Sequence, residues 1–122
     1  MTALDHVSIS TADYGRSLKF YEAALAPLGI KTLMQFEGQA AGLGTEVPFF
    51  WIGAGDRSGH THVAFSADSR AAVDAFHAAA LAAGGKDNGG PGIRENYSPN
   101  YYAAFVLDPD GHNIEAVCYA PE

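Results

Sequence analysis

Two histidines and one glutamate could together bind a metal ion, and they stand in three separate strand-like segments. His6 precedes Val7, His62 precedes Val63, and Glu115 lies inside Asn-Ile-Glu-Ala-Val. Because side chains alternate between the two faces of a strand, we expect these three on the face opposite to the apolar residues beside them. Two imidazoles and a carboxylate form the facial triad that holds divalent iron, manganese or a similar ion and leaves positions open for substrate. The alternative is that each is a separate solvated or hydrogen-bonded group.

Glu115 is the least expected of the three, because it interrupts an apolar strand between Ile114 and Ala116. A carboxylate in such a strand needs either solvent or a partner. The strand is the second half of a predicted hairpin whose turn is the Asp-Pro-Asp-Gly sequence at 108–111. In that turn proline presets one backbone angle and glycine accepts a positive one.

A glycine-rich segment, residues 86–100, is a candidate lid over the face that carries the three residues. It contains Arg94, which is a candidate for binding an anionic substrate group, with a surface salt bridge as the alternative. Tyr97, in the same segment, is a second candidate for substrate binding. Tyr101 follows the segment and is the candidate catalytic residue. It and Glu115, after ligand exchange, are the two candidates for a general base.

Aromatic side chains cluster at Phe49, Phe50 and Trp51. They could wall an apolar pocket or a dimer interface, although such clusters more often belong to a core. We assign Trp51 to substrate binding. The remaining histidines are not assigned to the site: His60 and His112 are expected in polar loop or turn surface, and His77 on a helix face. The single cysteine, Cys118, is expected to be a small strand residue.

The elements that position these residues are predicted from apolar periodicity and turn signals. Helices are expected from a cap at Asp13 to about Ala26 and from Ser69 to Ala83, each stopped by glycine or proline. The predicted strands cover 4–10, 30–36, 39–45, 48–52, 61–66, 101–107 and 113–117.

The second half of the chain repeats the first at an offset of 56 residues. Six non-alanine residues are identical at this offset, among them both strand histidines and the glycine that follows each helix. The matched pairs are His6 and His62, Val7 and Val63, Ser10 and Ser66, Phe20 and Phe76, Leu25 and Leu81, and Gly29 and Gly85. We therefore predict an α+β fold of two β-α-β-β-β modules, about 1–56 and 57–122, in one domain covering 1–122. The helices would cover the outer face of a cupped mixed sheet.

Composition limits the partners. The chain has 122 residues, 48% hydrophobic and 17% charged, with a formal net charge of −7 and a pI of about 5.0. This charge would repel a nucleic-acid backbone, and no segment is long and apolar enough to cross a membrane. One cysteine excludes an internal disulfide and a cysteine metal cluster. Without a targeting signal, we expect a soluble protein in the cytoplasm.

The whole pattern resembles the vicinal-oxygen-chelate superfamily, which includes glyoxalase I, extradiol dioxygenases, fosfomycin-resistance thiol transferases and bleomycin-binding proteins. The resemblance rests on the paired modules, the His-Val starts at 6 and 62, and the Asp-Pro-Asp-Gly-x-x-x-Glu ending at Glu115. It implies His6, His62 and Glu115 as metal ligands, with a fourth ligand position near Phe50 or Trp51. An aromatic residue there argues against the four-ligand arrangement of glyoxalase I. Phe105 stands where the extradiol pattern has a tyrosine.

The resemblance implies a homodimer that binds a divalent ion (Fe, Mn, Zn, Ni or Mg) and acts on a small oxygen-chelating substrate. Lyase, isomerase, oxygenase and thiol-transferase chemistry all stay open. In each, the metal would act as a Lewis acid on neighbouring substrate oxygens. The alternative is a non-catalytic binder of a drug or metabolite, similar to the bleomycin-resistance proteins.

Overall fold

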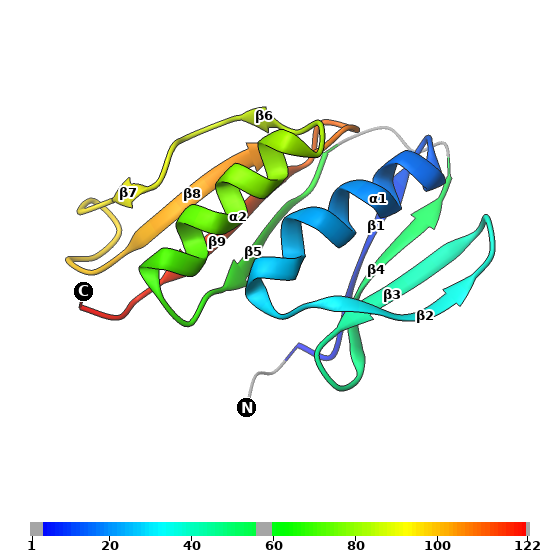
Figure 1. The fold of residues 1–122 in the computed structure, drawn as a ribbon, viewed down its shortest axis with the longest axis horizontal. Coiled ribbons are helices and arrows are strands. Elements are labelled where there is room, and N and C mark those ends of the chain that lie inside the picture. The colour runs from blue at the N-terminus through cyan, green and yellow to red at the C-terminus, as the bar shows by residue number, and fades with distance from the viewer. Residues whose placement is uncertain (1–3, 56–59, 122) are drawn as a thin grey trace.

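Two mixed β-sheets lie side by side, and both helices cover the same face of the pair (Figure 1). The computed structural model describes residues 4–55 and 60–121. The strands are β1 Val7–Thr11, β2 Lys31–Phe36, β3 Ala40–Gly44, β4 Pro48–Ala54, β5 His62–Ser66, β6 Lys86–Asp87, β7 Gly92–Ile93, β8 Tyr102–Leu107 and β9 Asn113–Cys118. The helices are α1 Tyr14–Leu25, its 3-10 continuation η1 Ala26–Leu28, and α2 Arg70–Ala82. The predicted α+β fold of two β-α-β-β-β modules is confirmed.

Each module forms its own sheet. The strand orders are β1-β4-β3-β2 and β5-β9-β8-β6, with β7 also paired to β8. The first strand of each module pairs in parallel with the last, so that Ser8 lies opposite Trp51 and Ala64 lies opposite Glu115. Ser8 and Ala64 are 56 positions apart, which is the offset of the sequence repeat. Trp51 is therefore the counterpart of Glu115 in the first module.

The segment 86–100 was predicted as a loop, and this was wrong for two short pieces of it. β6 and β7 both pair antiparallel with β8 and together take the place of the second strand of the module, the counterpart of β2 in the first module. Between them lie Gly89, at φ +141°, and Pro91, which has no backbone N–H to donate. These residues divide the strand into two pieces.

Both helices begin at the predicted caps. The side chains of Asp13 and Ser69 each accept a hydrogen bond, at 3.1 Å, from the backbone N–H three residues later. Gly29 and Gly84, at φ +79° and +104°, follow the helices in the left-handed conformation that glycine adopts most readily. Gly85, the repeat partner of Gly29, has a different role, because a Cβ there would lie 2.7 Å from the Phe20 ring.

The core lies between the helices and the two sheets. Its largest apolar side chains are Phe20, Tyr21, Leu25, Leu43, Phe50, Ile52, Val73, Phe76, Val106 and Ile114. In β9, Ile114 and Ala116 belong to this core, whereas Glu115 points to the other face, as its parity predicts. No helix among the described residues is long and apolar enough to cross a membrane.

Asp110 and His112, in and after the turn at 108–111, connect the second module to the first. Asp110 accepts from the Thr11 hydroxyl at 2.5 Å and the Ala12 N–H at 3.0 Å. His112 accepts from the Thr61 N–H at Nδ1 (3.0 Å), so its Nε2 carries the proton and donates to the Ser10 carbonyl at 2.8 Å. His112 is only 4% exposed, so its predicted place on the turn surface was wrong.

Asp108 anchors the same turn to helix α1. Its carboxylate is 4% exposed and accepts from the Tyr21 hydroxyl at 2.5 Å and from the amides of Asp110 and His112 at 2.9 and 2.8 Å. Burial, and then the negative charge of Asp108, raise the pKa of Tyr21 well above its usual value. Tyr21 therefore keeps its proton and acts as a buried hydrogen-bond donor.

Ser17, on the buried face of α1, carries a hydroxyl with no hydrogen-bond partner in the described structure. Burying such a group costs about 1–3 kcal/mol, and alanine is the better helix former. We expect Ser17→Ala to raise the free energy of unfolding in urea by about 0.5–1.5 kcal/mol. Ser69→Ala is the control with the opposite sign, because it removes a helix cap and loses about 1 kcal/mol. A fall in stability for Ser17→Ala would show that the hydroxyl has a partner.

Candidate functional site

Glu115 occupies the middle of the second sheet on the face without helices. It lies between Ala64 of β5 and Phe105 of β8, and it is 2% exposed. A carboxylate buried to this degree requires hydrogen-bond donors. His62 and Tyr101 supply them.

His62 begins β5, two residues before Ala64, so its side chain lies on the same face as Glu115. Its Nε2 is 2.9 Å from Oε1 of Glu115, and about half of the imidazole is exposed, 52%. The ring also contacts Phe105 edge to face at 6.2 Å between centroids. One side of this imidazole is therefore fixed by the carboxylate while the other is open to a small molecule.

Tyr101 lies directly before β8 and donates its hydroxyl to Oε2 of Glu115. Burial, followed by this hydrogen bond and the charge of Glu115, raises the pKa of Tyr101 far above its ordinary value. The phenol therefore holds its proton at neutral pH and acts as a donor to the carboxylate. Tyr97 and Tyr119 pack against its ring at centroid distances of 4.9 and 5.2 Å.

His6 lies on the first sheet, immediately before β1. Its Nδ1 is 2.8 Å from the Asp5 carboxylate, and its side chain is 54% exposed. A carboxylate at Nδ1 holds the proton there and leaves Nε2 as the ligand atom, as in many metal-binding histidines. Within residues 4–55 and 60–121, however, no three His, Cys, Asp or Glu side chains are grouped closely enough to hold one ion. The structure thus brings His62 and Glu115 together but does not bring His6 to them.

The chemistry of the His62–Glu115 pair fits a divalent metal ion. Imidazole nitrogen and carboxylate oxygen are the usual donors for Fe, Mn, Ni and Zn. Nε2 of His62 and Oε1 of Glu115 lie 2.9 Å apart, so one ion could take both as ligands in place of the hydrogen bond between them. The fourth ligand position, expected near Phe50 or Trp51, falls on Trp51, since Phe50 is 1% exposed in the core.

Arg94 lies beside this site, with its guanidinium 5.3 Å from the centre of the Phe105 ring. Three of its N–H groups donate to main-chain carbonyls, those of Gly90 (2.8 Å), Gly92 (2.9 Å) and Ala103 (3.3 Å). It makes no ion pair with the described residues, in contrast to the alternative prediction of a surface salt bridge. Arg94 therefore organises segment 86–100 and lies against Phe105, the residue of β8 that pairs with Glu115.

Two other histidines have structural contacts. Nε2 of His77 is 3.0 Å from Asp87, which ties α2 to β6 and, with the Gly89 N–H, lowers the pKa of Asp87. His60 is exposed and its ring lies 6.0 Å from that of His112. Sequence reasoning missed Asp5 as a partner of His6, although a carboxylate directly before a histidine was the available signal.

The profile of the glyoxalase/bleomycin resistance protein/dioxygenase superfamily matches residues 3–116 of the chain. The chain belongs to this superfamily. Comparison with curated proteins finds no match. Among solved structures, a glyoxalase/bleomycin resistance protein from Albidiferax ferrireducens T118 is similar at 30% identity, with a TM-score of 0.84 over 98% of this chain and 100% of the other.

More distant superfamily members share the fold. A glyoxalase/bleomycin resistance protein/dioxygenase family enzyme from Burkholderia phytofirmans PsJN has 22% identity and a TM-score of 0.76, covering 98% of this chain and all of its own. A lactoylglutathione lyase from Agrobacterium tumefaciens has 17% identity and a TM-score of 0.72, covering 97% and 94%. At these identities the likeness concerns the fold alone.

Proposed function

We propose that this superfamily member is a metal-dependent enzyme whose site is centred on His62 and Glu115. The observation that carries the proposal is the contact of the buried Glu115 carboxylate with the half-exposed imidazole of His62 on the open face of the sheet. The proposed substrate is a small molecule that chelates the ion through neighbouring oxygens.

The residues of the chain have distinct tasks in this proposal. His62 and Glu115 would hold the ion, and when bound the ion supplies Lewis-acid stabilisation of negative charge on substrate oxygen. Tyr101 donates to Oε2 and so fixes the rotamer of Glu115 while keeping its own proton. We assign Tyr101 a positioning role in place of the predicted role of general base. Arg94 and Tyr97 remain proposed substrate contacts at the edge of the site.

His6 is the proposed third protein ligand. It lies on the other sheet, and the described residues of one chain do not group it with His62 and Glu115. The homodimer expected from the sequence would supply His6 from a second copy. This arrangement can be tested with two variants that are each defective at a different ligand.

A binding protein without catalysis is the second candidate, and Trp51 favours it. Trp51 stands in the first module where Glu115 stands in the second, so an aromatic surface replaces a carboxylate. Such a protein would hold its ligand without needing a metal. The two functions differ in whether metal binding at His62 is required for the ligand to bind.

Metal titration of untagged protein tests the first proposal. We expect wild type to bind one Mn²⁺ or Ni²⁺ per site by calorimetry and His62→Ala to lose at least 100-fold in affinity, because one of two closely placed ligands is gone. His77→Ala is the matched control, since it removes a histidine bound to a carboxylate outside the site and should leave the affinity unchanged. Equal metal binding by wild type and His62→Ala would contradict the proposal.

Whether His6 comes from a second copy of the chain can be tested by mixing two variants. If His6 acts across a dimer, mixing His6→Ala with Glu115→Ala after partial unfolding and refolding should regenerate one tight site in each mixed dimer, whereas neither variant alone has one. If all ligands come from one chain, the mixture should bind no better than its components.

A further inference from the structure

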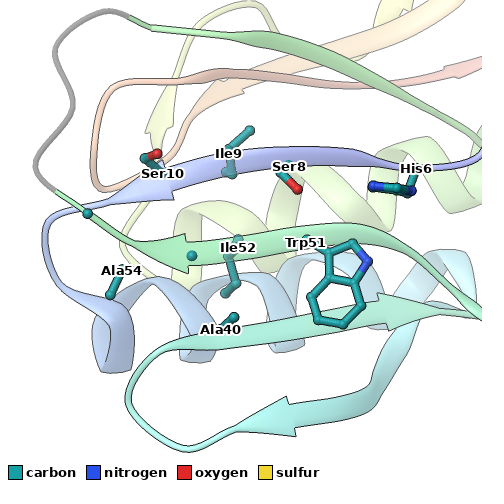
Figure 2. A pocket seen from close by; sticks show the side chains of 10 residues that line it. His6, Ser8, Ile9, Ser10, Ala40, Trp51, Ile52 and Ala54 are labelled. Atoms are coloured by element: carbon teal, nitrogen blue, oxygen red, sulfur yellow. The ribbon is translucent and has the colours of Figure 1, made fainter.

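Asn88 and Gly89 lie between β6 and β7, at the outer edge of the second sheet (Figure 1). They are separate from the pocket on the first sheet that Figure 2 shows, which His6 and Trp51 line and which therefore belongs to the proposed site. The chain has asparagines at 88, 96, 100 and 113, and only Asn88 is followed by glycine. Such an asparagine can lose its side-chain amide without an enzyme, because the next main-chain nitrogen can attack it where no side chain blocks the approach.

Asn88 and Gly89 form a bulge opposite a single residue of β8. The Asn88 N–H donates to the Phe105 carbonyl at 2.9 Å, and the Gly89 carbonyl accepts from the Phe105 N–H at 2.8 Å. Two residues on one side of the ladder therefore face one residue on the other, which is the pattern of a β-bulge. The peptide bond between Asn88 and Gly89 lies inside the bulge, so a change in this bond separates the two groups that pair with Phe105.

The nitrogen of Gly89 is outside the strand ladder. Its N–H donates to Oδ1 of Asp87 at 3.0 Å, and the Asp87 side chain is 62% exposed. The hydrogen bond from His77, and then that from the Gly89 N–H, lower the pKa of Asp87, so this carboxylate is ionised at neutral pH. A hydrogen bond to an ionised carboxylate draws the proton away from the nitrogen and makes it a better nucleophile. Attack by this nitrogen breaks no hydrogen bond between strands.

The fold requires glycine at position 89. Its φ of +141° lies in a region that other residues rarely adopt. A Cβ there would also lie 3.0 Å from Nη2 of Arg94 and 3.1 Å from Cδ1 of Phe105. The residue type that leaves Asn88 open to attack is therefore fixed by the packing of its neighbours.

The Asn88 side chain is accessible to water. It is exposed, and its Nδ2 donates to Oδ1 of Asn113 at 3.2 Å. An exposed hydrogen bond between two neutral amides contributes about 1 kcal/mol, which is too little to hold the side chain in one rotamer. The Asn88 amide can therefore turn toward the Gly89 nitrogen.

We propose that Asn88 is a site of spontaneous modification, which converts it to aspartate and isoaspartate through a cyclic imide. The Gly89 nitrogen bonds to Cγ of Asn88, the Cγ–Nδ2 bond breaks, and the amide nitrogen leaves as ammonia with the proton that the Gly89 nitrogen loses. Water then opens the five-membered imide. Opening at Cγ gives aspartate, and opening at the main-chain carbonyl carbon gives isoaspartate. The reaction needs no metal and no oxidant, so it does not depend on the proposed function.

Isoaspartate changes the pairing of the sheet edge. Its main chain runs through Cβ and Cγ, which inserts one extra atom between the N–H of residue 88 and the carbonyl of Gly89. These two groups then no longer match Phe105, whose other neighbour in the sheet is Glu115 of β9. The modification thus loosens the edge strand one strand away from Glu115.

Peptide mass spectrometry tests the modification. The chain has Lys86 and Arg94 but no Lys or Arg after Arg94, so trypsin places Asn88 alone on peptide 87–94 and the other three asparagines on 95–122. After incubation with EDTA at physiological pH and temperature, we expect the amide-to-acid conversion to be at least about 10-fold faster on 87–94 than on 95–122. An isoaspartate-specific methyltransferase should label 87–94. A sample digested without incubation gives the baseline.

Variants and hydrogen exchange test the mechanism and its consequence. Asn88→Gln keeps the amide but requires a six-membered ring, so conversion on 87–94 should fall at least about 10-fold. Asn96→Gln, at an exposed asparagine followed by tyrosine, is the matched control and should leave conversion on 87–94 unchanged. In aged wild type, the fast-exchanging fraction of the Phe105 N–H should equal the isoaspartate content, whereas the Ile114 N–H should exchange as in fresh protein.

Four results would contradict the proposal. Equal conversion on the two peptides would show that Asn88 is not a preferred site, and conversion of Asn88→Gln at the wild-type rate would exclude the five-membered imide. Aspartate without isoaspartate would mean direct hydrolysis of the amide. A Phe105 N–H that stays slow in protein containing isoaspartate would show that the sheet edge is not loosened. Because EDTA removes metal throughout, failure of the metal proposal changes none of these outcomes.

Discussion

Replacing Asp108 with alanine is expected to lower the free energy of unfolding by about 3–4 kcal/mol. The carboxylate is buried and accepts from the Tyr21 hydroxyl and from two backbone amides of the hairpin turn. Alanine leaves these donors without a partner where water has little access, and the cost of an unpaired buried donor exceeds the gain from a formed bond. Urea unfolding followed by circular dichroism measures the change.

Asp68→Ala is the matched control, because Asp68 is exposed and the substitution removes the same charge. We expect its stability to lie within about 0.5 kcal/mol of wild type. Tyr21→Phe keeps the ring in the core and removes only the hydroxyl that donates to Asp108. In a double-mutant cycle of Tyr21→Phe and Asp108→Ala, we expect a coupling free energy of about 1–2 kcal/mol. If Asp108→Ala were as stable as Asp68→Ala, the turn would not be an anchor for the first module.

Most of the fold could be predicted from the sequence because local signals and the repeat agree. Asp13 and Ser69 are strong cap residues, strand alternation is regular, and the offset of 56 assigns the same order of elements to both halves. The short strands β6 and β7 could not be predicted, because they form only by pairing with β8. Each of these strands is only two residues long and has glycines close by, so neither segment carries a strand signal of its own.

The candidate site could be predicted only in part. The sequence placed Glu115 and His62 on one face of the sheet, because side chains alternate between the two faces of any strand whatever its neighbours are. The role of His112 was not predictable, because its partners Thr61 and Ser10 come from distant parts of the chain. Its place in a turn suggested solvent, whereas packing between the modules buries it. The contact of Tyr101 with Glu115 likewise depends on how the chain enters β8.

Glu115→Gln is expected to have the largest effect on the proposed site. The substitution preserves shape but removes the negative charge and turns one acceptor into a donor, which then faces either the Tyr101 hydroxyl or the His62 ring. We expect Mn²⁺ or Ni²⁺ affinity to fall by more than about 100-fold. Asp87→Asn is the matched control, because it also converts a carboxylate bound to a histidine into an amide, but on the helix-facing side, and should leave metal affinity unchanged.

Tyr101→Phe distinguishes positioning from ligation at the same carboxylate. Tyr101 touches Glu115 and not the proposed ion, so its loss should weaken metal binding only about 10-fold by freeing the Glu115 rotamer. The expected order of affinity is therefore wild type, then Tyr101→Phe, then Glu115→Gln. If Tyr101→Phe were as defective as Glu115→Gln, the phenol itself would have to be a ligand. If both variants bound metal as wild type does, the buried carboxylate would serve only to hold His62 and Tyr101 in place. The protein would then be better explained as a binding protein without catalysis.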